Sequence, residues 1–227
     1  MTISLITTAS NDNNTGTSAS VTHGFTISSG DVIIASVHAN NAGNNATDNN
    51  GSTPFTLADG ANTPTSSYMT LFSRVCGASE PSSYAFTISN ARWSVVLRQY
   101  RGVDSSVWDV TPAAGNRTTG NFVATAVSAS ITIVTDQACG LVWSCDDNTP
   151  TTTTYSSINN SYANVKSESG QQYQVTADRL GLSTGTLGAT TITSSGNVTY
   201  VMWQAALKPA AASSYTPRHL ALFGAGG

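Results

Sequence analysis

Charged side chains are scarce in this chain of 227 residues. Asp, Glu, Lys and Arg together make up 9% of the sequence, against about 25% in ordinary soluble domains. Lys166 and Lys208 are the only lysines, and the arginines are scattered along the chain. A protein that neutralises many phosphates needs clustered basic residues. The composition therefore predicts that nucleic acid is not a partner.

Long apolar runs and a secretory leader are also missing. No stretch approaches the ~20 apolar residues that span a bilayer, so we expect no membrane partner. The first residues, MTISLITTAS, lack the basic start and the long apolar stretch of a signal peptide. We therefore expect synthesis in the cytoplasm of the producing cell, and departure from it only by lysis or within an assembly.

The sequence contains 3 cysteines and lacks any CxxC pair or Cys/His cluster with metal spacing. Cys139 and Cys145 belong to the run CGLVWSC, which is typical of one strand. Two ends of such a strand lie about 20 Å apart, too far for a disulfide. Their parity with Leu141 and Trp143 turns both thiols toward the core. Cys76 lies in another apolar strand, and we expect it to be free and buried as well.

Helical spacing of apolar residues is absent up to Pro209, and short alternating segments take its place. In RWSVVLRQY, for example, Trp93 and Leu97 share one face while Tyr100 takes the other, so both faces are partly covered. Turn residues separate such segments at short intervals, which is typical of a sandwich. We predict an all-β fold, a two-sheet antiparallel sandwich over residues 1–208. Its shared core is expected to contain Phe86, Trp93, Leu97, Leu141, Trp143 and Trp203.

Two polar stretches and two late strands complete the expected layout. Residues 10–16 and 40–52 consist largely of Asn, Gly, Asp, Ser and Thr, which predicts exposed connections. The last strands are expected at GATTITS and VTYVMWQAALKP. In the second of these, Val201 and Trp203 share a face with Ala205 and Leu207.

Residues 209–227 differ in character from the rest of the chain. Residues 210–214 look like a flexible linker, whereas residues 215–223 are largely apolar. Two interpretations stay open: a frayed terminus, which is common, or an extended C-terminal arm that docks on a neighbouring subunit through apolar and aromatic anchors. The docking residues of such an arm would be Tyr215, Arg218, Leu220, Leu222 and Phe223.

Patterns that support catalysis or metal binding are weak. No G-x-S-x-G elbow is present, and the only glutamates, Glu80 and Glu168, lie outside any recognisable motif. Asp12 and residues 48–50 are candidates for calcium, but Asx residues in turns serve the backbone far more often. We therefore expect no catalytic residues, no metal and no cofactor. An enzyme would instead need a carboxylate or Ser–His cluster that only the fold brings together.

Three short motifs carry a resemblance to a known family. YRGVD at 100–104 follows a core strand, GDVI at 30–33 opens a strand with a Gly-Asp turn, and AALKP at 205–209 ends the last strand. Together they resemble a family of β-sandwich proteins common in phage genomes and prophages. The resemblance implies a jelly-roll-like, non-enzymatic module of the virion, on the capsid surface as decoration or in a tail or fibre. Its partners would be other virion proteins or further copies of the chain.

The YRGVD motif also has a physical interpretation of its own. Gly102 permits a turn with positive φ at the end of the strand, and Asp104 can bond backbone amides just beyond it. These roles are structural. The motif therefore argues for a fold and leaves the chemistry open.

A carbohydrate-binding module is the alternative function, since lectin domains also use jelly rolls. Tyr155, Tyr162 and Trp108 lie in segments that look like loops, where they could stack on a sugar; for Trp108, packing under its own turn is the competing interpretation. A glycan partner of this kind predicts two or more coplanar, exposed aromatic rings on one face.

Overall fold

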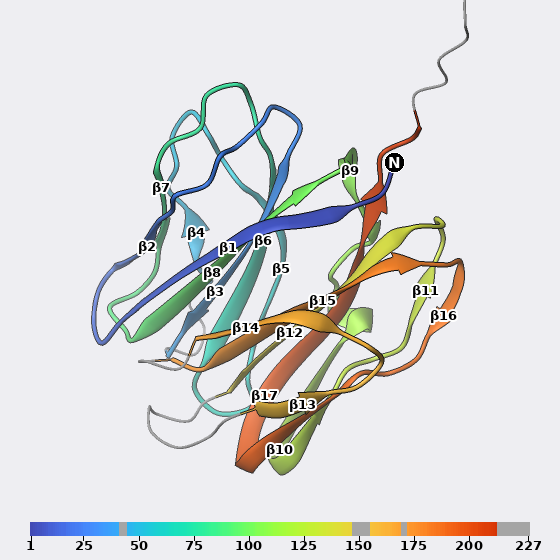
Figure 1. Ribbon diagram of the computed structural model, residues 1–227. Coiled ribbons are helices and arrows are strands. Elements are labelled where there is room, and N and C mark those ends of the chain that lie inside the picture. The colour runs from blue at the N-terminus through green and yellow to red at the C-terminus, as the bar shows by residue number, and fades with distance from the viewer. Residues whose placement is uncertain (41–44, 147–154, 169–171, 213–227) are drawn as a thin grey trace, which may run out of the picture.

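The computed structural model describes residues 1–40, 45–146, 155–168 and 172–212, with the side chains of residues 122 and 156 excepted. Antiparallel strands are the dominant regular structure of this part (Figure 1), and its one helical element is the 3₁₀ turn η1 (Ala114–Asn116). The predicted all-β sandwich is confirmed. No helix in these ranges is long and apolar enough to cross a membrane.

The central layer is a five-stranded sheet with the order β1-β8-β3-β6-β5. Both faces of β3 and nearly all of β8 are buried, because a further sheet packs on each side of this layer. The predicted double coverage of the RWSVVLRQY segment is thereby confirmed. The five strands are β1 (Ser4–Asn13), β8 (Trp93–Arg101), β3 (Val32–Ala39), β6 (Tyr68–Val75) and β5 (Thr56–Asn62).

The second layer is a seven-stranded sheet built around β17, which pairs with four other strands. The sequence predicted two strands where β17 is continuous; a register shift between Val123 and Thr125 of its neighbour absorbs the polar SSGN segment in the middle. The strands are β10 (Arg117–Val127), β17 (Thr191–Pro209), β12 (Ala138–Asp146), β15 (Gln174–Leu182), β14 (Ala163–Glu168), β13 (Tyr155–Ile158) and β9 (Val103–Val110).

Two small sheets cover the outer faces of these layers. A three-stranded sheet of β2 (Ser18–Thr22), β7 (Ser83–Thr87) and β4 (Thr47–Asp48) lies against the five-stranded sheet. A two-stranded sheet of β11 (Ile131–Ile133) and β16 (Gly185–Leu187) lies against the seven-stranded sheet. The sandwich therefore carries an extra cover on each side.

The expectation of one shared core is wrong, although all six of its residues are buried. Leu141, Trp143 and Trp203 pack between the two large sheets. Trp93 and Leu97 pack on the far side of the five-stranded sheet, in one cluster with Phe86 of the three-stranded sheet. Alternation along a strand sends successive side chains to opposite faces, and the three-stranded sheet supplies a second apolar layer there.

Three segments form strands that the sequence did not predict. Residues 10–13 continue β1, because their backbone pairs with β8 as far as Trp93. Thr47–Asp48 in the predicted connection at 40–52 forms β4 against β7. Strand β9 begins within YRGVD, at Val103, and pairs with β17. In the first two cases a neighbouring strand satisfies backbone groups whose side chains give no apolar signal.

The predictions for the thiols are confirmed. Cys76, Cys139 and Cys145 are free and buried. Cys139 and Cys145 lie in the same cluster as Leu141 and Trp143, as their parity predicted. Burial and the nearby Glu80 raise the pKa of Cys76 to about 12, so this thiol stays protonated.

Candidate functional site

Three segments that are far apart in the sequence meet at one end of the sandwich, beside the N-terminus and the end of β17 (Figure 1). They contain the three motifs of the phage-family resemblance. We call this region the junction and define it as residues 1–3, 28–31, 99–104 and 208–210. It is the last described structure before the segment predicted to be a docking arm.

Asp31 and Arg101 form the inner half of the junction. The Asp31 side chain is 2% exposed, and Arg101 binds it in a bidentate manner, with Nε 2.8 Å from Oδ1 and Nη2 2.8 Å from Oδ2. Gln99 Nε2 and the Ser28 N–H also donate to Oδ2, at 2.7 and 2.9 Å. Burial opposes ionisation, but these donors, Arg101 first, hold the pKa of Asp31 below its usual value. The GDVI turn is thus tied to the YRGVD motif.

Gly102 forms the outer half. Its φ of +80° lies in the left-handed region, as predicted, and a Cβ at this position would lie 2.5 Å from the carbonyl oxygen of Thr2. Its own carbonyl accepts a hydrogen bond of 2.8 Å from the Ala210 N–H, and the Met1 amino group donates to the Ala210 carbonyl at 2.8 Å. Both backbone groups of Ala210 are therefore held, so the chain beyond β17 starts from a fixed point.

Asp104 closes the outer rim of the junction. Its Oδ1 accepts from the Ser106 N–H at 2.9 Å, the backbone role that the sequence predicted. Lys208 Nζ lies 3.9 Å from the same oxygen, and both side chains are partly exposed. Such an exposed pair contributes only about 0–1 kcal/mol. The backbone bonds, more than this ion pair, hold the rim.

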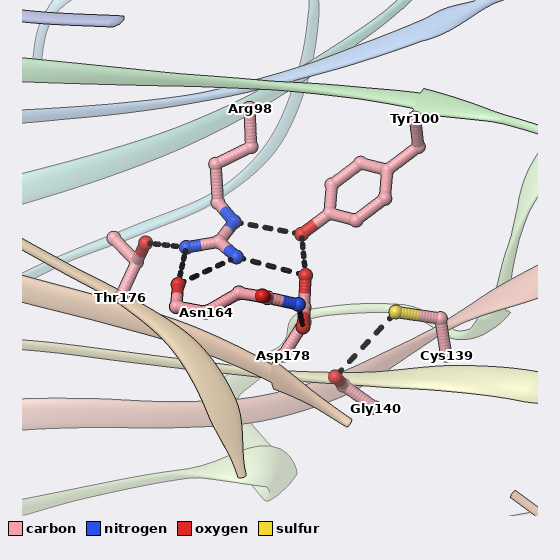
Figure 2. A network of polar contacts seen from close by, with 7 residues as sticks. All are labelled: Arg98, Tyr100, Cys139, Gly140, Asn164, Thr176 and Asp178. Carbon is pink, nitrogen blue, oxygen red and sulfur yellow. Dashed lines mark hydrogen bonds and ion pairs between the residues drawn. The ribbon is translucent and has the colours of Figure 1, made fainter. Parts of the chain in front are cut away.

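A second polar cluster lies between the two large sheets (Figure 2). Arg98 on β8 is 1% exposed and donates from Nη2 to Asp178 Oδ2 at 2.8 Å, while its Nε donates to the Tyr100 hydroxyl at 2.7 Å. Its Nη1 donates to Thr176 Oγ1 at 2.7 Å and to the Asn164 carbonyl at 3.0 Å. The donors and acceptors of this cluster satisfy one another, and all of the residues named here except Asn164 are buried, which suits a structural role.

This cluster was not predicted from the sequence, although a signal was present. Arg98 shares the parity of Tyr100 in a strand with two apolar faces, and such a buried arginine needs an acidic partner. Asp178 has the same parity as Gln174 and Thr176 in QYQVTADRL, so β15 presents a polar face. Neither pattern says that these faces meet, because the two strands are about 80 residues apart.

Glu80, one of the two glutamates, is likewise engaged by an arginine. Arg74 binds both of its oxygens, at 2.9 and 2.8 Å, and the Tyr84 hydroxyl donates to Oε2 at 2.7 Å. Burial opposes ionisation, but Arg74 and the Gly77 N–H keep the pKa of Glu80 below its usual value. This carboxylate is thus poorly suited to accept a proton near neutral pH.

The candidate calcium residues Asp12 and Asp48 both lie in strands. Asp48 Oδ1 accepts from Asn50 Nδ2, whose amide oxygen in turn accepts from the Ala85 N–H at 2.9 Å. Asp12 lies in β1, opposite Ser94 of β8. Within the described residues, no group of three or more His, Cys, Asp or Glu side chains is placed to hold a metal ion.

The aromatic residues named for sugar stacking are turned inward. Trp108 lies in β9 and meets Trp143 edge to face, with 6.4 Å between the ring centroids. Tyr162 does lie in a turn, but it is buried in the cluster outside the seven-stranded sheet, and Tyr155 packs against the same cluster. None of the aromatic side chains that the structure describes is exposed. A coplanar aromatic platform is therefore missing from this part of the chain.

The predicted docking residues Tyr215, Arg218, Leu220, Leu222 and Phe223 lie outside the described residues. What is described is the point from which they follow, residues 208–210 of the junction. Compared with known proteins, the chain matches no family model, no curated protein and no solved structure. These comparisons do not test the resemblance to phage β-sandwich proteins, which serves only to support a proposed function.

Proposed function

We propose that this chain is a non-enzymatic structural protein of a phage virion, on the capsid surface or in a tail or fibre. In this proposal the sandwich is a rigid body and residues 213–227 attach it to other virion proteins or to further copies of itself. The observation that carries the proposal is the double anchoring of Ala210, whose N–H and carbonyl are bound by Gly102 and Met1. A docking segment works best from a fixed base, because a rigid base lowers the entropy lost on binding.

The resemblance adds a second line of support. Its three motifs are about 70 to 105 residues apart along the sequence, yet their residues contact one another at the junction, through Asp31–Arg101 and through Pro209 opposite Val103. A family pattern of this kind is understandable if the family needs this end of the sandwich to be built in one way. The remaining polar surface offers few of the aromatic anchors that dominate stable interfaces.

The test is to find the chain in particles. Particles released from the strain that encodes this chain would be purified on a density gradient and analysed by quantitative mass spectrometry and imaging. We expect the chain at a fixed copy number per particle, in one repeated location. Absence of the chain from purified particles would overturn the proposal.

The attachment segment is tested by deletion. Removing residues 213–227 retains Ala210 and its hydrogen bonds, so we expect thermal unfolding to stay within about 2 °C of the full chain, since no described contact is lost. Incorporation into particles should fall strongly. A matched variant keeps the length and replaces Tyr215, Leu220, Leu222 and Phe223 by serine, and it should fail in the same way. Normal occupancy of both variants would place the attachment surface on the sandwich.

A further inference from the structure

A solvent-open cavity of about 420 Å³ lies outside the seven-stranded sheet, away from the junction contacts. Its volume falls within the range of about 300–1,000 Å³ typical of small-molecule sites. Ile133, Leu182 and Leu187 form a buried apolar floor. The rim is the exposed segment 183–186 with Gly181 and Gly188, which supplies hydroxyl groups and backbone. The cavity thus pairs an apolar floor with a polar rim.

Arg179 is the one charged side chain among the residues that line this cavity. It lies on β15, on the opposite face from Asp178, and is half-buried. Its Nη1 donates to the Asn160 carbonyl at 2.8 Å. The other N–H groups of its guanidinium have no protein acceptor in the described part of the chain. They form a donor edge that remains for a ligand.

Of the five other arginines in the described part of the chain, four are paired with an acid, and Arg92, like Arg179, is not. Arg74, Arg98, Arg101 and Arg117 each pair with a carboxylate, at distances between 2.8 and 3.1 Å. Arg179 is half-buried in a cavity, yet no carboxylate of the described residues pairs with it. Asp136 is the nearby acid, and its Oδ1 is taken by the Thr184 N–H at 2.9 Å on the rim. A guanidinium edge matches a carboxylate or a phosphate, each of which it can bind through two hydrogen bonds.

The wall beside Arg179 is held in place before any ligand arrives. Asn160 and Ser161 both have positive φ, 59° and 58°, which turns the Asn160 carbonyl toward Arg179. The Asn160 amide donates to the carbonyls of Gly188 and Ala189, at 3.2 and 2.9 Å. Asn160 thus ties the arginine to the rim, through its backbone carbonyl on one side and its side-chain amide on the other. Fixed donors lose little entropy on binding, so this arrangement favours recognition.

We propose that this cavity binds a sugar residue that carries a carboxylate, such as a hexuronic acid. Its carboxylate would take the free edge of Arg179, its hydroxyls the polar rim, and its C–H face the floor of Leu182 and Leu187. This mode needs no exposed aromatic ring, which distinguishes it from the stacking expected of a lectin-like platform. The proposal does not depend on the virion assignment.

The test uses the full chain and three small probes. D-glucuronic acid, D-glucose and N-acetyl-glutamic acid amide would be titrated against ¹⁵N-labelled protein, with amide shifts and saturation-transfer NMR as readouts. We expect D-glucuronic acid to bind and to shift the amides of Gly181, Gly185 and Gly188, with D-glucose about tenfold weaker or more, because the charged hydrogen bonds are lost. Absence of D-glucuronic acid binding would overturn the proposal. Equal binding of the glutamate probe would overturn the assignment to a sugar.

Three variants locate the binding. Arg179→Gln should weaken D-glucuronic acid about tenfold or more, while Arg92→Gln, at a site away from the cavity, should leave it unchanged. Gly188→Phe keeps Arg179 but adds a ring where a Cβ meets nothing within 4 Å, and it should block binding without loss of thermal stability. Unchanged affinity in both Arg179→Gln and Gly188→Phe would show that the ligand lies elsewhere.

Discussion

The space between the two large sheets has an apolar half and a polar half. Beneath β12 and β17 it contains Trp143, Trp203 and their aliphatic neighbours, all within one cluster. Beneath β15 the facing side chains are Gln174, Thr176 and Asp178, all fully buried. Gln174 accepts from Ser36 Oγ at 2.6 Å and donates to Ser94 Oγ at 2.8 Å. Two neighbouring strands of one sheet therefore use opposite chemistry against the same partner layer.

The two halves contribute in different ways. Apolar burial stabilises by about 25 cal/mol per Å² with little directional demand. A buried ion pair such as Arg98–Asp178 gains little net free energy, because desolvation offsets the attraction, but breaking it leaves a buried charge without its partner. We infer that the apolar half supplies most of the free energy of folding, and that the polar half selects how the sheets are placed on one another.

The largest expected effect lies in the apolar half. Trp143 is 1% exposed, and Trp143→Ala should lower the free energy of unfolding by about 3–5 kcal/mol, as large-to-small substitutions in a core do. Urea denaturation followed by circular dichroism measures it. Trp143→Phe, which leaves a smaller cavity, is the matched variant and should lose clearly less. A loss below about 1 kcal/mol for Trp143→Ala would show that this half is not the main source of stability.

The polar half should behave differently when both partners change. Arg98→Met alone should cost about 3 kcal/mol, because Asp178 is left buried without its guanidinium. Arg98→Met combined with Asp178→Leu should recover part of that loss, since no unpaired charge remains. Denaturation of the two single variants and the double variant measures the coupling. Losses that simply add would contradict the proposed division between the halves.

His38 extends the comparison to pH. Its ring is fully buried on β3, near the Tyr173 carbonyl, and burial lowers its pKa from 6.5 to about 3. The folded chain therefore excludes a proton that the unfolded chain binds below pH 6.5. The stability contributed by the neutral ring is present above pH 6.5 and is lost as pH falls toward 3, by up to about 1.4 kcal/mol per pH unit.

Urea denaturation at several pH values between 7.5 and 4 measures this slope. His38→Leu should flatten it by up to about 1.4 kcal/mol per pH unit, because the titrating group is gone. His23→Gln is the control: His23 stacks on Tyr84 in the cluster beneath the three-stranded sheet. This variant should retain the part of the pH slope that His38 contributes. Equal slopes for the parent chain and His38→Leu would show that His38 is not protonated on unfolding as proposed.

The smallest expected effect is at the exposed rim of the junction. Lys208 is 40% exposed and lies 3.9 Å from Asp104. Lys208→Ala should change the free energy of unfolding by no more than about 0.5 kcal/mol, since solvent screens such a pair. The contrast with Arg98→Met separates buried from exposed ion pairs in one protein. A loss above about 2 kcal/mol would mean that Lys208 has a structural role that its exposure does not suggest.

Much of the fold could be predicted where side chains alternate strongly. The predictions of which side chains point inward from β8, β12 and the end of β17 are confirmed, because alternation of apolar residues is a local property. The extension of β1 to Asn13 was missed, since its polar side chains carry no such signal and its strand character comes from pairing with β8. The sequence showed the three motifs of the junction separately, and only the fold shows that they contact one another.

The sequence by itself determined the class of the protein: strands without an α-helix in the described residues, buried free thiols, and a turn at Gly102 that needs positive φ. Each follows from the chemistry of a residue and its nearest neighbours along the chain. The tertiary structure alone decided the division into several apolar layers, the pairing of Arg98 with Asp178, and the cavity beside Arg179. Those features depend on contacts between strands far apart in sequence, and local alternation says only which face a residue takes, not what that face will meet.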